Sequence, residues 1–187
     1  MSAIYRMLAE NPVIAAVKDR DDLNEAFQSQ AEGIFLLKGN ICELEEILQK
    51  SRSAGKKLFV HIDLLEGIGK DYYALKYLKE KFEPDGIITT KTNLVKYSKE
   101  INLPVIQRLF MLDSLSLETG RKSIKAMEPD AVEIMPGLVF SIIRRISEIY
   151  KKPVIAGGLI NDKADAFRCL DAGAMGISTS CKKLWSM

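Results

Sequence analysis

Short apolar segments recur along the chain at a nearly constant interval. Eight such runs, most of them four to six residues long and rich in Val and Ile, begin about 23 residues apart. That interval suits one buried strand, one short helix and two loops. Their length and composition predict buried strands at 13–17, 34–37, 58–62, 86–88, 104–109, 131–135, 153–156 and 174–177.

The segments between these runs show the periodicity of amphipathic helices. Leu23 and Phe27 lie four residues apart behind Asp22, which can cap a helix. Two longer stripes repeat every three or four residues: Ile41, Leu44, Ile47 and Leu48, then Ile142, Ile143, Ile146 and Ile149. A further helix should start near Asn161 and end near Gly173. Strands that alternate with helices predict parallel βαβ units.

Eight units of similar length favour a closed (β/α)₈ barrel of the TIM type, an α/β fold with parallel strands. An open doubly wound sheet is the alternative, but the chain shows no long crossover. At 187 residues the barrel would be compact, because typical barrels have about 250. No linker divides residues 1–187, so one domain is expected. Residues 1–11 precede the repeat and are expected to form a helix that closes the barrel bottom.

Composition narrows the class further. Lys and Arg number 27 and Asp and Glu 25, a net charge of +2, too small to indicate a nucleic-acid binder by charge alone. Cys42, Cys169 and Cys181 are odd in number and widely spaced, which argues against disulfides or a zinc site. The start resembles no secretory signal and no apolar run reaches membrane-spanning length. A cytoplasmic protein is therefore expected.

Charged residues follow several of the predicted strands, where barrels of this type hold their ligands. Since side chains alternate along a strand, His61 and Asp63 should face the lumen, and Val60 and Ile62 the helices. Extended to the other strands, this reasoning predicts a ring around one mouth: Lys18, Asp63, Lys91, Arg108 and Glu133.

Two points about this ring stay open. Lys91 is placed in the ring because it continues the alternation of Ile87 and Thr89. The first open point is which of Arg108 and Gln107 points inward from their strand. The second is the role of His61. His61 is a structural histidine or a catalytic base. A solvated rim of paired charges is the plain alternative, yet charges at strand ends are costly to bury unless paired or liganded, so a binding site is favoured.

The ends of the seventh and eighth predicted strands form the strongest candidate site. Gly157 and Gly158 end one strand, and Ser178, Thr179 and Ser180 end the next, just before a short segment at 182–185. Barrels commonly bind phosphate at these two loops. Glycines let backbone N–H groups approach an anion, hydroxyls add donors, and a following helix N-terminus favours negative charge. A glycine turn with a Ser/Thr cap is the alternative to the predicted phosphate site.

Weaker features surround this site. Pro136 and Gly137 form a turn after the sixth strand that could aim backbone groups at a ligand. Asp63, Glu66 and Glu133 could supply oxygens to Mg²⁺, but spacing does not place them on one centre. No metal and no cofactor are therefore expected.

Several stretches together resemble one protein family. They are 61–67 (HIDLLEG), 84–91 (PDGIITTK), 107–114 (QRLFMLDS), 129–137 (PDAVEIMPG), 156–160 (AGGLI) and 178–185 (STSCKKLW). In this order they resemble the glycerol uptake operon antiterminator family, from about Pro12 to Trp185. Four residues at three places depart from its pattern: Phe140-Ser141 replace Pro-Lys, Cys181 replaces Asn and Lys18 replaces Arg.

The resemblance implies a bacterial regulator with a TIM-barrel-like fold that responds to glycerol 3-phosphate and acts on leader mRNA to prevent transcription termination. Combined with the strand ends, it implies phosphate on Gly157, Gly158, Ser178, Thr179 and Ser180. The glycerol hydroxyls would meet Asp63, Glu133 and His61, with Lys91 or Arg108 nearby.

RNA binding would need a second, basic surface. The candidates are Lys56-Lys57, Arg121-Lys122-Lys125, Arg144-Arg145, Lys151-Lys152 and Lys182-Lys183, each of which could be an ordinary solvated face. Tyr150 is the nearest aromatic residue that could stack on a base. Two alternatives remain. One is a barrel enzyme acting on a small phosphorylated sugar or polyol, with acid–base groups from His61, Asp63 and Glu133 and with Lys91 as a charge stabiliser or Schiff base. The other is a metabolite sensor that regulates a protein partner. A homo-oligomer is compatible with each.

Overall fold

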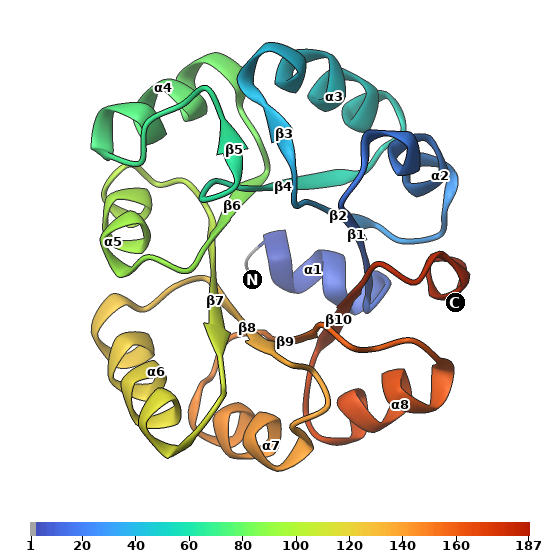
Figure 1. Cartoon of the computed structure of the whole chain (residues 1–187), viewed down its shortest axis with the longest axis vertical. Coiled ribbons are helices and arrows are strands. Elements are labelled where there is room, and N and C mark those ends of the chain that lie inside the picture. The colour runs from blue at the N-terminus through green and yellow to red at the C-terminus, as the bar shows by residue number, and fades with distance from the viewer. Residues whose placement is uncertain (1–2) are drawn as a thin grey trace.

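The computed structural model describes residues 3–187. Eight parallel strands close into a barrel in the order β1-β10-β9-β8-β7-β6-β4-β2 (Figure 1). They are β1 (Val13–Val17), β2 (Gly33–Leu36), β4 (Lys57–His61), β6 (Gly86–Thr89), β7 (Val105–Phe110), β8 (Ala131–Met135), β9 (Val154–Gly157) and β10 (Gly176–Thr179). β3 (Gly39–Asn40) and β5 (Leu65–Glu66) form a separate parallel pair. The predicted closed barrel is confirmed, and the open sheet is excluded.

A ring of helices surrounds the barrel (Figure 1). It consists of α2 (Leu23–Gln28), α3 (Ile41–Ser53), α4 (Tyr72–Phe82), α5 (Thr92–Glu100), α6 (Ser114–Met127), α7 (Phe140–Ile149) and α8 (Lys163–Asp171), with two 3₁₀ turns, η1 (Arg20–Asp22) and η2 (Lys182–Leu184). Asn40, Asp71, Asp113 and Asp162 accept hydrogen bonds from N–H groups in the first turns of their helices. Such caps satisfy donors that a helix leaves unpaired and so fix where each helix begins.

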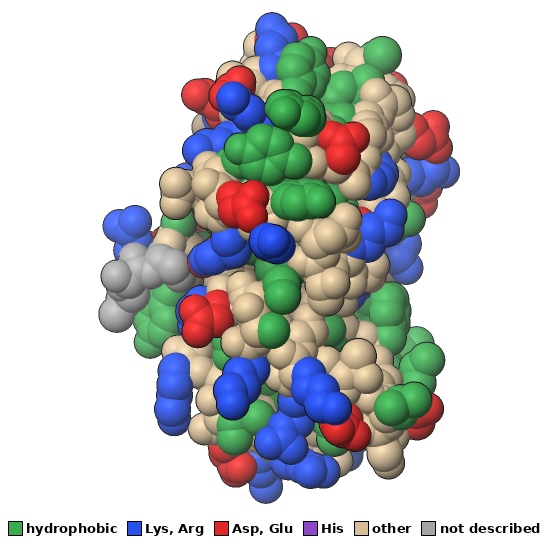
Figure 2. Space-filling model, turned by 90° about the vertical axis from the view of Figure 1, so that its left-hand side faces the viewer, with side chains coloured by type: hydrophobic (Ala, Val, Ile, Leu, Met, Phe, Trp, Pro, Cys, Tyr) green, Lys and Arg blue, Asp and Glu red, His purple; other side chains and the backbone are tan. Residues whose placement is uncertain are grey.

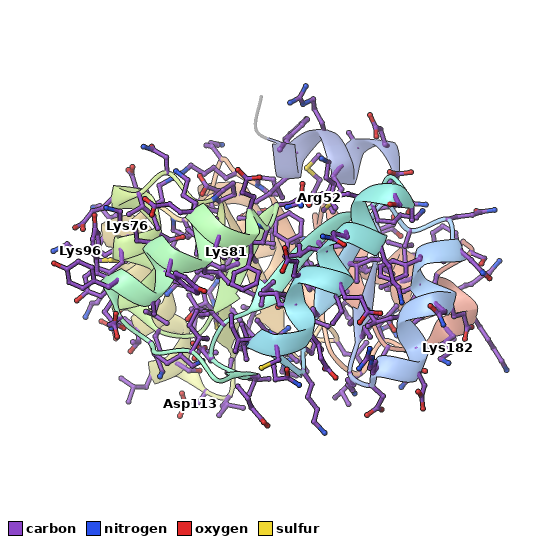
Figure 3. The ribbon with its side chains drawn as sticks, turned by 90° about the horizontal axis from the view of Figure 1, so that it is seen from above. Arg52, Lys76, Lys81, Lys96, Asp113 and Lys182 are labelled. Atoms are coloured by element: carbon purple, nitrogen blue, oxygen red, sulfur yellow. The ribbon has the colours of Figure 1, made fainter. Side chains whose placement is uncertain are left out.

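The N-terminal helix α1 (Ala3–Glu10) closes one end of the barrel. Its Ile4, Met7 and Leu8 are buried in the same cluster as the side chains that fill the lumen. Met7 and Leu8 lie so close to Gly33 and Gly176, the first residues of β2 and β10, that a Cβ there would clash. α1 therefore covers the amino ends of the strands, opposite Asp113 (Figure 3). Residues 1–2 of the expected cap segment lie outside the described part of the chain.

The strands divide the apolar side chains between two layers. The lumen is filled by Ile14, Phe35, Phe59, Ile88, Ile106, Ala131 and Ile155. The alternate residues, among them Val60, Ile62 and Ile87, pack between the barrel and the helices. The expectation for Val60 and Ile62 is confirmed. The alternation assumed for β6 is wrong, because Ile88 and not Ile87 faces the lumen, so it does not carry Lys91 inward.

Two further features concern the described residues as a whole. In residues 3–187, each helix is too short or too polar to cross a lipid bilayer. Cys42, Cys169 and Cys181 are all free thiols.

Candidate functional site

A cavity of about 90 Å³ lies at the carboxyl ends of the barrel strands. It is large enough for several water molecules or a small headgroup. Seven of the fourteen residues predicted for the ligand site line it: Lys18, Arg108, Glu133, Gly158, Ser178, Thr179 and Ser180. The sequence reasoning missed its remaining lining residues: Ala16, Leu37, Met135, Leu159, Ile160 and Asn161.

A buried ion pair forms one wall of this cavity. Arg108 Nε donates to Glu133 Oε2 at 2.6 Å, and Ser178 Oγ donates to Glu133 Oε1. The Glu133 side chain is fully buried and that of Arg108 is 8% exposed. Because an unpaired charge would be very costly there, each group holds the other in place. Gln107 faces the other way and donates to Ser123 Oγ in α6, which settles the open orientation: Arg108 points inward.

Gly157 is required by this ion pair. A Cβ on Gly157 would lie 2.4 Å from Glu133 Oε1 and 2.7 Å from Ser178 Oγ. The Pro136–Gly137 turn supports the same region from outside the cavity, since Gly137 N–H donates to Gly158 O at 3.0 Å. These three residues were predicted to touch the ligand; none of them lines the cavity, and in the structure they position the groups that do.

The glycine loop after β9 has an unusual backbone conformation beside the cavity. Gly158 and Leu159 both have positive φ angles, +77° and +63°, a conformation that is rare for a residue such as leucine and often marks functional loops. Outside the strand ladders, none of the backbone hydrogen bonds of residues 3–187 uses the N–H of Gly158 or that of Ser180. Ser180 is exposed at the mouth. These groups provide a place for an anion beside the ammonium group of Lys18.

Two of the predicted hydroxyl donors are already engaged. Ser178 donates to Glu133, and Thr179 Oγ1 donates to Ile160 O at 2.7 Å and accepts from Cys181 N–H at 3.0 Å. Thr179 therefore fixes the C-terminal segment, together with Trp185, whose Nε1 donates to Thr179 O. The helix expected after the eighth strand is only the three-residue turn η2, which is too short to add the dipole of a helix N-terminus at this site.

His61 lies deeper in the barrel, outside the lining of the cavity. It is 4% exposed, and within the described residues its Nδ1 has no hydrogen-bond partner. Burial lowers its pKa to about 4, reinforced by the charge of Arg108 and opposed by Asp63 and Glu133. The imidazole is therefore neutral near pH 7, and Nδ1 is a buried polar atom available to water or to a ligand.

Asp63 braces two strand ends. Its carboxylate accepts from Thr89 Oγ1 at 2.8 Å, Thr90 N–H at 2.7 Å and Thr90 Oγ1 at 2.9 Å. Burial raises the pKa of Asp63, but the hydrogen bonds from Thr90 and Thr89 outweigh burial and hold the pKa below its usual value. Asp63 does not line the cavity and its carboxylate turns toward the threonines, so its contact with ligand hydroxyls stays a prediction.

Lys91 and Glu66 lie away from the cavity. Lys91 is exposed at the start of α5, so it does not belong to the lumen ring in which it was predicted. Glu66, predicted as a ligand residue, is exposed in β5. Sequence reasoning also missed Lys70, whose ammonium group donates to Leu65 O and Ile68 O and whose pKa is lowered mainly by burial. Within residues 3–187 no three His, Cys, Asp or Glu side chains form a group that could hold a metal ion.

The three departures from the family pattern are accommodated locally. The Arg168 guanidinium lies 4.3 Å from the centroid of the Phe140 ring, a cation–π contact. Cys181 Sγ donates to Asn161 O at 3.3 Å, and Lys18 keeps a positive charge at the cavity. The cavity is thus intact with these residues.

The fold and the site define a compact TIM-type barrel with a polar pocket at the carboxyl ends of its strands. Comparison with known proteins then places it more closely: residues 13–185 match the family described as glycerol-3-phosphate responsive antiterminator, and the chain belongs to that family.

Individual relatives are similar to this chain over nearly their whole length. The uncharacterized protein YgcP of Escherichia coli (strain K12) is 38% identical over 184 residues, covering 98% of this chain and 96% of YgcP. The glycerol uptake operon antiterminator regulatory protein of Listeria monocytogenes superimposes with a TM-score of 0.89 at 31% identity, covering 94% of this chain and 95% of that one. A glycerol uptake operon antiterminator-related protein of Thermotoga maritima gives 0.83 at 33% identity, with 94% and 98% covered.

Enzymes share the architecture only. An aldolase named QR15 is 15% identical with a TM-score of 0.70, covering 94% of this chain and 92% of its own. Such identity shows the fold and carries no chemistry.

Proposed function

We propose that this protein senses glycerol 3-phosphate and, when it is bound, acts on the leader mRNA of glycerol-metabolism genes to prevent termination. The observation that carries the proposal is the cavity at the strand ends, which is lined by the glycine loop at Gly158, by Ser180 and by Lys18. The family match over residues 13–185 supports the choice of ligand.

The geometry suits the two halves of glycerol 3-phosphate. Backbone N–H groups, the Ser180 hydroxyl and the Lys18 ammonium would bind the dianionic phosphate by charge-assisted hydrogen bonds. Arg108 and Glu133 supply a donor and an acceptor for the glycerol hydroxyls. Exposed Leu159 lies at the rim and would cover the carbon chain.

A calorimetric titration tests ligand binding. Glycerol 3-phosphate should bind, inorganic phosphate should bind more weakly, and glycerol should show no heat. At about 100 times Kd the ligand should stabilise the fold by about 2.7 kcal/mol, which raises Tm by roughly 5–11 °C for a domain of this size. Absence of binding by glycerol 3-phosphate would overturn the proposal.

Filter binding of leader RNA, with and without glycerol 3-phosphate, tests the regulatory step. Because coupling between two sites is reciprocal, the ligand should tighten RNA binding by the same factor by which RNA tightens ligand binding. Equal RNA affinity in both conditions, together with unchanged antitermination, would reject the coupled sensor.

The enzyme alternative receives less support from the site. A Schiff-base lysine is desolvated, whereas Lys91 is exposed outside the cavity and Lys18 is exposed at its rim. Borohydride trapping of a lysine with a phosphorylated carbonyl substrate would favour that alternative.

A further inference from the structure

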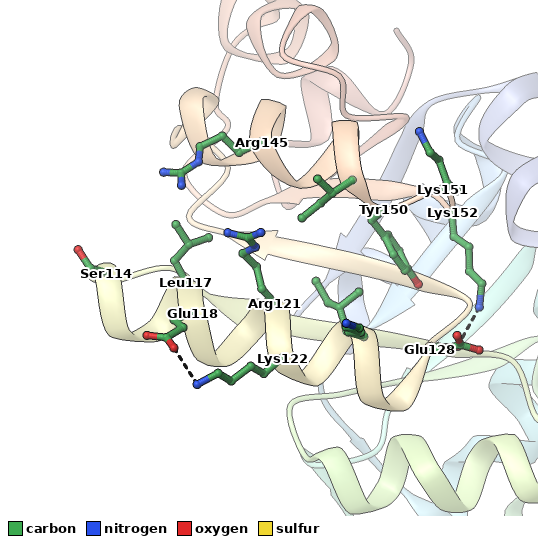
Figure 4. A pocket seen from close by; sticks show the side chains of 13 residues that line it. Ser114, Leu117, Glu118, Arg121, Lys122, Glu128, Arg145, Tyr150, Lys151 and Lys152 are labelled. Carbon is green, nitrogen blue, oxygen red and sulfur yellow. Dashed lines mark hydrogen bonds and ion pairs between the residues drawn. The ribbon is translucent and has the colours of Figure 1, made fainter.

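A second and much larger hollow lies on the outside of the barrel. A groove of about 890 Å³ runs between α6 and α7 (Figure 4). We call it the α6–α7 groove. Its apolar surface is provided by Leu117, Ile124, Ile149 and Tyr150. Ile149 is 55% exposed, so part of this surface is open to solvent.

Positive charge is concentrated around this groove. Six basic residues and two acidic residues line it, a net charge of +4 against +2 for the whole chain, so the rest of the molecule is net negative. The basic residues are Arg121, Lys122, Lys125, Arg145, Lys151 and Lys152. Figure 2 shows basic side chains gathered over the lower part of its face, the side on which Figure 1 places α6.

Most of these charges are not neutralised. Within the described residues, the side chains of Arg121, Lys125 and Arg145 have no ion-pair or hydrogen-bond partner. Lys152 donates to two backbone carbonyls, of Glu128 and Pro129, which leaves its charge uncompensated. Only Lys122 is paired, with Glu118 at 2.7 Å.

We infer that the α6–α7 groove is where this protein binds single-stranded RNA, an inference that rests on the proposed function. Proteins that bind single strands combine a basic groove that follows the phosphates with flat or apolar surfaces on which bases stack. Arg121 and Arg145 face the groove from opposite walls (Figure 4), and guanidinium groups bind phosphates and stack on bases. The Tyr150 ring lies along the floor and is held there by its hydroxyl, which donates to Pro129 O.

The groove is also connected to the ligand cavity through the chain. Arg108 lies in β7, the strand that leads into α6, and Glu133 lies in β8, the strand that leads into α7. The ion pair that lines the cavity therefore joins the two strands that carry the groove walls. A ligand that shifts this pair would bias the spacing of the walls, which gives coupling a physical route.

The test compares two double variants with the same change in charge. Arg121→Glu with Arg145→Glu alters the groove, whereas Lys81→Glu with Lys163→Glu alters exposed, unpaired cations outside it. The probe is a fluorescent oligouridylate of about 20 nucleotides, measured by anisotropy from about 0.05 M salt upward. For single strands, each phosphate contact adds about 0.7 to the slope with which the logarithm of affinity falls against the logarithm of salt concentration. At 0.1 M salt this corresponds to about fivefold in affinity.

The groove variant should therefore lose at least about 25-fold in affinity at 0.1 M salt, with a slope smaller by about 1.4, and the control variant should lose much less. Equal losses in both variants would overturn the inference. So would equally tight binding of a polyglutamate peptide of matched length, which would indicate an acidic protein partner, or a change in oligomeric state of the groove variant alone, which would indicate a second copy of the chain.

Failure of the groove and failure of the proposed function give different results. If the wild type binds leader RNA in a glycerol 3-phosphate-dependent way and the groove variant does so equally well, the groove assignment is wrong and the function stands. If the wild type binds neither RNA at any salt concentration, the proposed function itself fails.

Discussion

The buried ion pair at the mouth of the barrel makes a sharp prediction about stability. Glu133→Gln removes the charge opposite Arg108 while keeping nearly the same shape. The Glu133 side chain is fully buried and that of Arg108 is 8% exposed, so solvent cannot replace the lost partner. Breaking a buried pair from one side costs about 3–5 kcal/mol. Since glutamine keeps one acceptor for Arg108, we expect a loss of about 3 kcal/mol at the lower end of that range.

Urea unfolding followed by circular dichroism measures this loss, and Tm should fall by roughly 6–12 °C. Glu118→Gln serves as the matched control, because its ion pair with Lys122 is exposed and should be worth less than about 0.5 kcal/mol. Adding Arg108→Met to Glu133→Gln removes the stranded charge and should recover much of the loss. If Glu133→Gln costs no more than Glu118→Gln, the pair does not hold the mouth together.

Three other predictions follow from neighbouring groups. The folded-state pKa of His61 is about 4 against 6.5 in the unfolded chain, so the unfolded state binds the extra proton between these pH values. The free energy of unfolding should therefore fall by up to about 3 kcal/mol as pH drops from 6.5 to 4. In His61→Gln the free energy of unfolding should depend less on pH across that range, and the same pH dependence as in the wild type would contradict the prediction. Gly157→Ala should cost about 1–3 kcal/mol by crowding Glu133, whereas Gly39→Ala, whose Cβ would have only ordinary contacts, should cost far less; equal unfolding midpoints would refute this. Ser180→Ala should weaken glycerol 3-phosphate binding about 5–10-fold without loss of stability, while Thr179→Val should lower stability and leave the intrinsic affinity nearly unchanged. Calorimetry measures the affinity and urea unfolding the stability; a stable Thr179→Val that binds weakly, or an unstable Ser180→Ala that binds normally, would contradict this prediction.

The architecture could be predicted because it follows from the periodic pattern of apolar residues. Eight short runs rich in Val and Ile, separated by helical stripes, determine a closed barrel in which Phe59 fills the lumen and Val60 faces the helices. The inward positions of Lys18 and Glu133 follow from the same alternation. This part of the structure depends on burial, which the sequence displays directly.

The polar contacts could not be predicted in the same way. Alternation fails beyond the end of a strand, so Asp63 turns toward Thr89 and Thr90. Lys91 lies outside the lumen for another reason: Ile88 and not Ile87 faces inward from β6, so the alternation was assigned to the wrong face. Likewise, the sequence shows that Ser178 and Thr179 carry hydroxyls but not that Glu133 and Ile160 already accept their protons. The α6–α7 groove was visible only as separate basic clusters, because its walls come from segments about 25 residues apart that the fold brings together.

A crystal structure of the protein grown with glycerol 3-phosphate tests the central claim most directly. The account predicts the phosphate group at the mouth of the barrel, within hydrogen-bond distance of the N–H groups of Gly158 and Ser180. A mouth that stays empty at saturating ligand, or a phosphate bound only in the α6–α7 groove, would contradict it.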